Sequence, residues 1–339
     1  MKLCITGGGT GGHLMIADAL ATKALENGFE VIFIGSTSGQ DRKYFEGKSN
    51  FSYVYFLNSS GVVNKRGFAK VKAMWNIFRA FLVSREILKR HKIEATYSVG
   101  GFSAAAASFA SLSLRISLFI HEQNAVLGRL NSLLKPYAKR FVSAYDKDSS
   151  IKGYPVKDVF FKSQRIRESL KCIIFLGGSH GAKAINDLAL SVAQELKKRD
   201  IKIIHQAGES DYERVKQEYK DLGVEVELYG FTKDLDKLIS RADLAVSRAG
   251  ASTLWELSAN GLPALFVPYP YAASDHQYHN ASFIVKNELG WCQREGDELR
   301  EKLLSTVGKP LEQKSKKLIE YSIKGVADMM IKDIKETLK

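Results

Sequence analysis

The strongest constraint in the sequence is a pattern that occurs twice: a short apolar run, a cluster of glycines and then a helical stretch. The first copy combines Lys2–Thr6 with Gly7–Gly12, and the second combines Lys171–Leu176 with Gly177–Gly181. A strand that leads through glycines into a helix is the opening unit of a doubly wound α/β domain. Two copies therefore predict two such domains in one chain.

Each half continues with apolar runs that alternate with helical segments. Further strands are expected, in chain order, at Glu30–Ile34, Phe51–Leu57, Ala95–Val99, Ser117–Ile120, Arg140–Ser143, Lys202–His205, Glu225–Tyr229, Asp243–Val246 and Ala264–Val267. Strands that alternate with helices are typical of a parallel sheet with helices on both faces. The predicted fold class is α/β, with two Rossmann-like, doubly wound parallel-sheet domains that face an interdomain cleft.

The pattern restarts after Pro155, and 339 residues are enough for two domains. We expect an N-terminal domain over residues 1–157 and a C-terminal domain over residues 158–319. The stretch from Leu311 to Lys339 has a helical pattern. We expect a C-terminal helix at about 320–339 to pack back on the N-terminal domain.

The net charge of +13 is unevenly distributed. Residues 1–155 hold 21 basic against 10 acidic side chains, whereas residues 156–339 hold 29 against 27. The first half is therefore expected to face something anionic, such as nucleic acid, a phospholipid surface or a pyrophosphate. The three cysteines are far apart and indicate neither a disulfide nor a zinc site. With no signal-peptide pattern and no membrane-spanning apolar run, a cytoplasmic protein is expected.

Three junctions lead from a strand through glycines into a helix: Gly7–Gly12, Gly100–Gly101 and Gly177–Gly181. Unpaired N–H groups at a helix start favour anions, although the glycines can also serve only as tight turns. The first junction is no Walker A segment, because no Lys-Ser/Thr follows it. It also lacks the acid that dinucleotide-binding enzymes carry at the end of the second strand, where Gly35 and Ser36 stand. A nicotinamide dehydrogenase is therefore weakly supported.

His13 follows the first glycine segment in the first turn of the predicted helix. The positive end of the helix dipole disfavours a charged imidazole there, so a neutral, proton-accepting side chain is expected. The alternative is a structural histidine in a cap or core. Because the glycine segment is expected to open into a cleft, we interpret His13 as a candidate general base.

Five motifs stand in a fixed order along the chain. They are Ile5–His13 (ITGGGTGGH), His121–Asn124 (HEQN), Gly177–Ala182 (GGSHGA), Arg248–Leu257 (RAGASTLWEL) and Asp275–Ala281 (DHQxxNA). Together they resemble the MurG family, the UDP-GlcNAc:lipid I N-acetylglucosaminyltransferases of peptidoglycan synthesis. The resemblance runs from Leu3 to about Trp291. It implies the GT-B fold, with the donor held mainly by the second domain.

The resemblance also implies roles for single residues. His13 matches the proposed base of the family, Ser179 would hold the diphosphate, and Glu256 would bind the ribose hydroxyls. A carboxylate suits a diol because it accepts two hydrogen bonds. The other expected donor-side residues are Thr10, Gly11, Gly12, Asn124, Arg248, Ala251, Ser252, Thr253 and Leu254, with Gln277 and Asn280 on the GlcNAc hydroxyls. The expected acceptor-side residues are Gly101, Phe102, Ser103, Glu122 and Asn124.

Two positions depart from the family pattern. Ile16 stands where proline is common, and Lys157 stands where arginine is common at the domain junction. Lysine keeps the charge but lacks the planar fork of arginine. No metal or other cofactor is expected: the pairs Asp146/Asp148 and Asp234/Asp236 have D-x-D spacing but lie among lysines, so we interpret them as solvated surface.

The implied reaction is an inverting transfer of GlcNAc from UDP-GlcNAc to the C4 hydroxyl of MurNAc in lipid I, which is undecaprenyl-pyrophosphate-linked MurNAc-pentapeptide. The product is lipid II. One alternative is another nucleotide-sugar transferase with a different lipid acceptor, such as diacylglycerol. A second is a non-enzymatic, basic nucleic-acid binder. The sequence carries no motif that reads DNA or RNA, so nucleic acid is not an expected partner.

Residues 65–92 hold nine basic side chains and one acid, with apolar residues interleaved at helical spacing. A basic amphipathic helix with Trp and Phe suits the surface of an anionic membrane. The alternative is a core-packed helix with a solvated basic face. The expected location is peripheral, on the cytoplasmic face of the inner membrane. The residues expected to touch lipid are Phe68, Lys72, Trp75, Phe78, Arg79 and Leu82.

Overall fold

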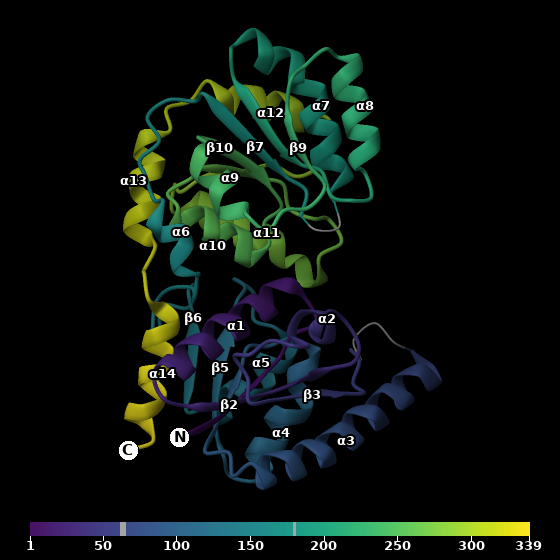
Figure 1. Cartoon of the computed structure of the whole chain (residues 1–339), viewed down its shortest axis with the longest axis vertical. Coiled ribbons are helices and arrows are strands. Elements are labelled where there is room, and N and C mark those ends of the chain that lie inside the picture. The colour runs from purple at the N-terminus through teal and green to yellow at the C-terminus, as the bar shows by residue number, and fades with distance from the viewer. Residues whose placement is uncertain (62–65, 179–180) are drawn as a thin grey trace. The chain divides into compact units, whose positions relative to one another are not determined.

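The computed structural model describes residues 1–61, 66–178 and 181–339 (Figure 1). The chain divides into two compact units. Unit 1 comprises Met1–Val156 together with Gly325–Lys339, and unit 2 comprises Lys157–Lys324. The chain thus starts in unit 1, passes through unit 2 and ends in unit 1.

The sheet of unit 1 has six parallel strands in the order β3-β2-β1-β4-β5-β6. The central strand is fully paired: Cys4 lies opposite Ile32 on one side and Thr96 on the other. Such strands are covered on both faces, which explains why they are apolar along their length. The strands are β1 Lys2–Thr6, β2 Glu30–Ser36, β3 Tyr53–Leu57, β4 Ala95–Ser98, β5 Ser117–Glu122 and β6 Arg140–Ser143.

Helices α1 and α14 of unit 1 come from opposite ends of the chain and pack together (Figure 1). The Nδ2 of Asn27 donates to Asp328 (2.9 Å), and the Nζ of Lys335 donates to the carbonyl oxygen of Asn27 (2.5 Å). The last helix is therefore part of the core of unit 1. The helices of this unit are α1 Gly11–Glu26, α2 Asp41–Phe45, α3 Gly67–Arg90, α4 Ala105–Ser113, α5 Arg129–Leu134 and α14 Val326–Thr337, with the 3-10 turns η1 Phe102–Ala104 and η2 Lys135–Tyr137.

Unit 2 repeats the design with six parallel strands in the order β12-β11-β10-β7-β8-β9. These strands are β7 Cys172–Leu176, β8 Lys202–Gln206, β9 Glu227–Tyr229, β10 Leu244–Ser247, β11 Ala264–Phe266 and β12 Trp291–Cys292. The helices are α6 Asp158–Lys162, α7 Lys183–Lys198, α8 Tyr212–Asp221, α9 Leu235–Arg241, α10 Ala251–Ala259, α11 His276–Lys286, α12 Glu298–Val307 and α13 Glu312–Tyr321, with the 3-10 turn η3 Ala273–Asp275.

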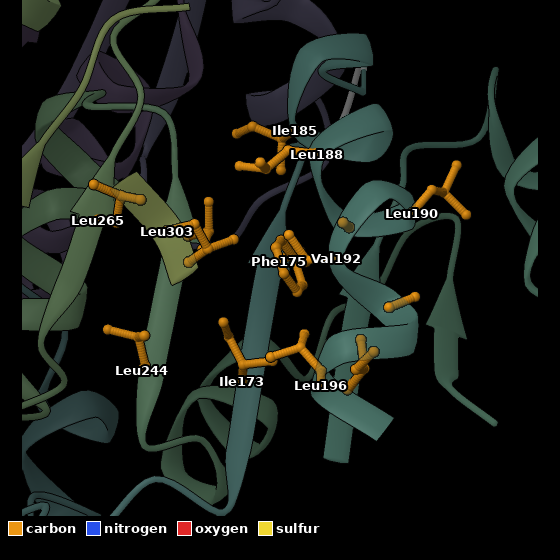
Figure 2. Packing of buried hydrophobic residues seen from close by; sticks show 14 of the residues in the cluster. Ile173, Phe175, Ile185, Leu188, Leu190, Val192, Leu196, Leu244, Leu265 and Leu303 are labelled. Atoms are coloured by element: carbon orange, nitrogen blue, oxygen red, sulfur yellow. The ribbon is translucent and has the colours of Figure 1, made fainter. Parts of the chain in front are cut away.

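The largest core cluster of unit 2 lies between its sheet and helices α7, α8 and α12. Figure 2 shows Ile173 and Phe175 of β7 facing the apolar side chains of α7. Ile185, Val192 and Leu196 are fully buried and recur at the spacing of one helical face. This packing fixes the start of α7, and with it the glycines that precede the helix.

The predicted fold class is confirmed: both units are parallel, doubly wound α/β domains. The main departures are at short edge strands. The two-residue strand β12 is missing from the prediction, and β9 begins at Glu227 rather than at Glu225. The boundary between the units falls between Val156 and Lys157. The predicted interdomain cleft stays a prediction.

Candidate active site

The first glycine segment, Gly7–Gly12, joins β1 to α1 and packs backbone against backbone on the next one. The N–H of Gly8 donates to the carbonyl oxygen of Gly100 (3.2 Å). A Cβ on Gly101 would lie 2.3 Å from the carbonyl oxygen of Gly8, and Gly9 has a φ of +84°. Only glycine fits these contacts. The predicted residues Gly11, Gly12 and Gly101 therefore belong to one compact arrangement.

A buried carboxylate, Asp41, holds this arrangement together. It accepts hydrogen bonds from the N–H groups of Gly9 (2.5 Å) and Ser36 (2.8 Å). Burial raises the pKa of Asp41, and these backbone donors oppose the rise. A Cβ on Gly8 or Gly35 would collide with the carboxylate. Sequence reasoning missed Asp41 and noted only that no acid stands at Gly35 and Ser36. Asp41 follows Gly35 by six residues, and its carboxylate is turned toward the glycine segment, where it accepts from Gly9.

The ring of His13 is held between two side chains. The hydroxyl of Thr10 lies 2.8 Å from Nδ1, and the Nε2 of Gln123 lies 2.9 Å from the Nε2 of His13. Gln123 was not singled out from the sequence, although it lies inside the HEQN motif. The structure thus joins the first and second motifs around the candidate base.

His121, two residues before Gln123, is fully buried. Neither of its ring nitrogens has a hydrogen-bond partner among the residues that the structure describes. Burial lowers the pKa of His121 to about 3, with a smaller contribution from the nearby charge of His13. His121 is therefore neutral at physiological pH and brings no fixed positive charge next to His13.

Glu122 organises the loop that follows β5. Its carboxylate accepts hydrogen bonds from the N–H groups of Asn124 (3.0 Å) and Gly128 (2.9 Å) and from the Nδ2 of Asn131 (2.9 Å). Glu122 and Asn124 line a cavity of about 300 Å³ together with Lys135 and other residues. The structure brings these two predicted acceptor residues into one hollow and gives Glu122 a role in shaping it.

Phe102 and Ser103, also predicted for the acceptor side, form the turn η1 beneath the first glycine segment. The ring of Phe102 occupies the space that a Cβ on Gly9 would need, with a separation of 2.6 Å. Ser103 is buried. Phe102 therefore packs against the glycine segment, and Ser103 is not accessible at the surface.

In unit 2, the second glycine segment lines a cavity of about 350 Å³. Gly177 and Gly181 share this cavity with Arg248 and Gln277, two residues predicted for the donor. Gly181 has a φ of +74°, which glycine adopts without strain. Ser179, predicted for the diphosphate, lies outside the described residues. The cavity nevertheless joins three of the five motifs.

Arg248 is held at the wall of this cavity. It forms an ion pair with Glu295 (2.6 Å) and donates to the carbonyl oxygens of Val267 (3.2 Å) and Pro268 (3.3 Å). Its guanidinium lies 5.4 Å from the centre of the Tyr269 ring. Sequence reasoning did not identify Glu295, which is far from the motifs in the chain.

Glu256 lies one turn into α10, with Ser252 donating to its Oε1 (2.7 Å). Burial raises the pKa of Glu256, while the Ser252 hydrogen bond and the charge of Lys157 counteract the rise. Lys157, weighed as a substitute for arginine, is thus electrostatically coupled to the predicted ribose ligand. Of the remaining α10 residues, Ser252 and Thr253 are half-buried, whereas Ala251 and Leu254 are buried.

Gln277 and Asn280 lie at the start of α11. The Oε1 of Gln277 accepts from the N–H of Tyr269 (3.0 Å), and the Nδ2 of Asn280 donates to the carbonyl oxygen of Ala249 (3.1 Å). Asn280 is fully buried, so it holds the segment before α10 in place. Of the two predicted GlcNAc contacts, only Gln277 lines the cavity.

The D-x-D pairs are engaged with lysines. Asp146 accepts from Lys135 (2.8 Å), which lowers the pKa of Asp146, and Asp234 pairs with Lys237 (2.7 Å). Within the described part of the chain, no group of three His, Cys, Asp or Glu side chains is arranged to hold a metal ion.

Helix α3 carries the residues predicted to touch lipid (Figure 1). One face, with the buried Ala73 and Ala80, packs on α4, and Leu88 joins a core cluster with Cys4 and Ile32 of the sheet. The opposite face exposes Phe68 (83% exposed) and Trp75 (59%). The structure exposes all six predicted residues: Phe68, Lys72, Trp75, Phe78, Arg79 and Leu82. Among the described residues, no helix is both long and apolar enough to span a membrane.

Two family models match the chain. The glycosyltransferase family 28 N-terminal domain matches residues 3–143, and the glycosyltransferase family 28 C-terminal domain matches residues 172–338. Each match therefore falls largely on one of the two α/β units.

Curated relatives match over almost their whole length. A protein of Sulfurimonas denitrificans is 69% identical over 98% of both chains. A protein of Sulfurovum is 52% identical over 97% of this chain and 98% of its own, and a Campylobacter jejuni protein is 47% identical over 98% and 96%. All three are named UDP-N-acetylglucosamine–N-acetylmuramyl-(pentapeptide) pyrophosphoryl-undecaprenol N-acetylglucosamine transferase.

Solved structures agree with the family match. MurG of Acinetobacter baumannii is 25% identical over 99% of both chains, with a TM-score of 0.81. A UDP-GlcNAc 2-epimerase from Neisseria meningitidis is 15% identical over 100% of this chain and 99% of its own, with a TM-score of 0.64, which shows the fold alone. The GT-B fold and the family resemblance are thereby confirmed. The chain belongs to glycosyltransferase family 28, within the group of MurG enzymes.

Proposed function

We propose that this chain transfers GlcNAc from UDP-GlcNAc to the C4 hydroxyl of MurNAc in lipid I and so forms lipid II. The observation that carries the proposal is the 69% identity, over 98% of both chains, to a transferase named for this reaction. The donor cavity of unit 2 supports it, because a glycine segment, Arg248 and Gln277 line one space.

The proposed step is a displacement at the anomeric carbon with inversion. The C4 oxygen of the acceptor bonds to the anomeric carbon of GlcNAc, and the bond to the β-phosphate oxygen breaks. The electron pair leaves with UDP. The proton of the C4 hydroxyl passes to His13. Base assistance of this kind typically contributes roughly 10²–10⁴-fold in rate.

The surroundings of His13 suit this role. The Gln123 amide nitrogen lies 2.9 Å from Nε2 and 3.2 Å from Nδ1, and the Thr10 hydroxyl lies 2.8 Å from Nδ1. The proposed reaction uses the neutral tautomer in which Nδ1 carries the proton and donates to Thr10. One lone pair is then available on Nε2 once the acceptor hydroxyl takes the place of Gln123. His121 is neutral and does not add to the charge that His13 acquires.

The leaving group is proposed to be stabilised in unit 2. The N-terminal end of α7 borders the cavity, and the lining carries two cations, Lys183 and Arg248, and one acid, Glu295, which pairs with Arg248. Helix starts and cations stabilise developing phosphate charge. We propose that Glu256 binds the ribose hydroxyls and that no metal is needed.

The decisive experiment is transfer of labelled GlcNAc from UDP-GlcNAc to a lipid I analogue. UDP-glucose and UDP-GalNAc serve as donor controls, and a diacylglycerol acceptor tests the alternative lipid. Product from UDP-GlcNAc and the lipid I analogue alone is expected. Preference for diacylglycerol, or no transfer at all, would contradict the proposed reaction.

We also propose that the exposed face of α3 rests on an anionic membrane, on the cytoplasmic side, as a peripheral contact. Phe68, Trp75, Phe78 and Leu82 project from the face that is not packed on α4, and Lys72 and Arg79 flank them. Exposed aromatic and basic side chains on one helix suit a lipid interface. A solvated nucleic-acid-binding helix has no need of so many exposed apolar side chains.

A further inference from the structure

A buried hydrogen-bond chain lies behind the second glycine segment of unit 2, and the proposed catalytic steps do not use it. Its members are Asn186 in α7, His205 in β8 and Tyr219 in α8. All three are buried, two of them completely. The surrounding cluster is otherwise apolar and includes Ile185, Val192, Ile203 and Val215. A polar chain in such a place needs a reason, because apolar residues of similar size would pack equally well.

This hydrogen-bond chain is continuous, and each of its hydrogen bonds has a normal length. The Nδ1 of His205 lies 3.0 Å from the hydroxyl of Tyr219, and its Nε2 lies 3.0 Å from the Oδ1 of Asn186. The Nδ2 of Asn186 donates to the carbonyl oxygen of Ala207 (3.0 Å) and to the carboxylate of Asp211 (2.7 Å).

Only one arrangement of protons satisfies all these groups. Both hydrogens of the Asn186 amide go to acceptors, so its oxygen faces His205. That oxygen can only accept, so the Nε2 of His205 carries the proton. Burial lowers the pKa of His205 to about 3, so the ring is neutral and its Nδ1 accepts from the Tyr219 hydroxyl. The side-chain orientations are therefore fixed from α8 through to Ala207.

The last link of the chain supports the glycine segment. A Cβ on Gly181 would lie only 2.8 Å from the carbonyl oxygen of Ala207. Gly177 donates its N–H to the carbonyl oxygen of Gln206 (2.9 Å), one residue earlier. Gly177 and Gly181 both line the donor cavity. The position of the cavity wall thus depends on the Gln206–Ala207 backbone, which Asn186 holds.

We propose that His205 is a positioning residue for the diphosphate of the sugar nucleotide. It orients the Asn186 amide, which fixes the Ala207 carbonyl against which Gly181 packs. His205 itself touches no ligand. The proposal rests on the proposed function in one respect, because it takes the occupant of this cavity to be a uridine diphosphate.

The test compares the affinities of UDP and uridine, measured by calorimetry on the full chain. The variant His205→Phe keeps the bulk and removes both hydrogen bonds, and Tyr219→Phe removes one hydroxyl. Val215→Ala is the matched control, because Val215 is fully buried on the same helix as Tyr219 and lies in the same core cluster. Val215→Ala lowers stability without touching the polar chain.

His205→Phe is expected to lower the affinity for UDP about tenfold, and Tyr219→Phe about threefold. These factors correspond to the loss of buried hydrogen bonds. Uridine, which lacks the diphosphate, is expected to bind all variants alike. Val215→Ala is expected to bind UDP as the unsubstituted chain does. A general loss of packing would instead weaken both ligands and would appear in Val215→Ala as well.

Unchanged UDP affinity in folded His205→Phe overturns the proposal, as does an equal loss for uridine. If His205→Phe does not fold, Tyr219→Phe decides, and unchanged UDP affinity there overturns it. The transfer assay keeps the two proposals apart. A chain that fails to transfer GlcNAc but still shows the selective UDP effect contradicts the proposed reaction and leaves the positioning role standing.

Discussion

At the scale of single residues, the environment of His13 makes a sharp prediction. The ring is held by Thr10 and Gln123, but the proposed reaction needs only its lone pair. His13→Ala should lower kcat by about 10²–10⁴-fold, the usual contribution of a general base. UDP affinity should not change, because the donor cavity lies in unit 2. Labelled-GlcNAc transfer and calorimetry with UDP measure the two quantities.

Gln123 provides the control for this prediction. Gln123→Ala leaves the imidazole in place and removes one of its orienting partners. In the proposed reaction the acceptor hydroxyl takes the place of Gln123 at Nε2, so we expect kcat to change by less than about tenfold, the factor that one hydrogen bond corresponds to. If the His13→Ala variant turns over at the normal rate, His13 is not the base, whatever Gln123→Ala does.

Glu256 makes a prediction about pH. Its carboxylate, if it binds the ribose diol, must be ionised to accept two hydrogen bonds. Burial raises the pKa of Glu256, so UDP binding should weaken as pH falls, and the weakening should begin above the usual carboxyl range. Glu256→Gln should weaken UDP about 10- to 100-fold at neutral pH, as expected for losing hydrogen bonds to a charged group.

Ser252→Ala sharpens the Glu256 test. The Ser252 hydroxyl lowers the pKa of Glu256, so its removal should shift the pH at which UDP binding weakens to a higher value. Calorimetry with UDP from about pH 5 to 8, a range that spans a raised carboxyl pKa, gives the profile. A profile that is flat for the unsubstituted chain, or identical in Ser252→Ala, would exclude Glu256 as the titrating ligand.

The residues that sequence reasoning missed share one property: their partners come from distant parts of the chain. In the sequence Asp41 is one acid in a polar stretch, but in the fold it begins α2 and accepts a hydrogen bond from Gly9. Glu295 stands in no motif, yet it pairs with Arg248. The motif residues were predictable because glycines and histidines at fixed spacings form a recognisable sequence pattern. Their partners were not predictable, because only the tertiary fold brings them together.

At the scale of elements, the sequence pattern predicted every strand of the described residues except β12, including the edge strands β3, β6 and β9. β1 was predicted at Lys2–Thr6 because its residues lie between neighbours and must be apolar. β12 is only Trp291–Cys292 and pairs on one side with β11. Two residues carry no periodicity, so packing and not sequence pattern defines this strand.

Helix α3 makes a prediction about the membrane. Replacing both Trp75 and Phe78 by Ala should reduce partitioning to anionic vesicles by at least about tenfold, given the apolar surface that each would bury in lipid. Fold stability should hardly change, because these side chains are exposed. Co-sedimentation with vesicles of anionic and of neutral lipid measures the effect.

Tyr137→Ala is the matched control for α3, because Tyr137 is an exposed aromatic residue of unit 1 outside that helix. Vesicle binding should be unaffected by it. Replacing Lys72 and Arg79 by Gln should lower the preference for anionic over neutral lipid, each basic residue contributing about 1 kcal/mol near a charged surface. Equal binding to both lipids by the unsubstituted chain would contradict the proposed membrane face.

At the scale of the whole molecule, the two units have separate cores but not separate stretches of sequence. The core of unit 2 lies entirely within Lys157–Lys324. Unit 1 needs α14, whose buried Met330, Ile331 and Ile334 come from the end of the chain. The helical pattern of the tail was visible in the sequence. The residues that α14 covers were not, because its partner α1 lies about 300 positions away.

Ending the chain at Lys324 should therefore affect the two units differently. The truncated chain loses the three fully buried side chains of α14, the Asn27–Asp328 hydrogen bond and the Arg140–Asp333 ion pair. Each buried apolar side chain contributes about 1.5–3 kcal/mol, so the loss is a large part of the stability of a domain.

Calorimetry should show unit 1 melting at a markedly lower temperature. UDP should still bind, while GlcNAc transfer is lost. Ending the chain at Thr337, after α14, should leave the melting temperature of unit 1, UDP binding and GlcNAc transfer unchanged. Loss of UDP binding in the shorter chain would mean that unit 2 does not fold independently.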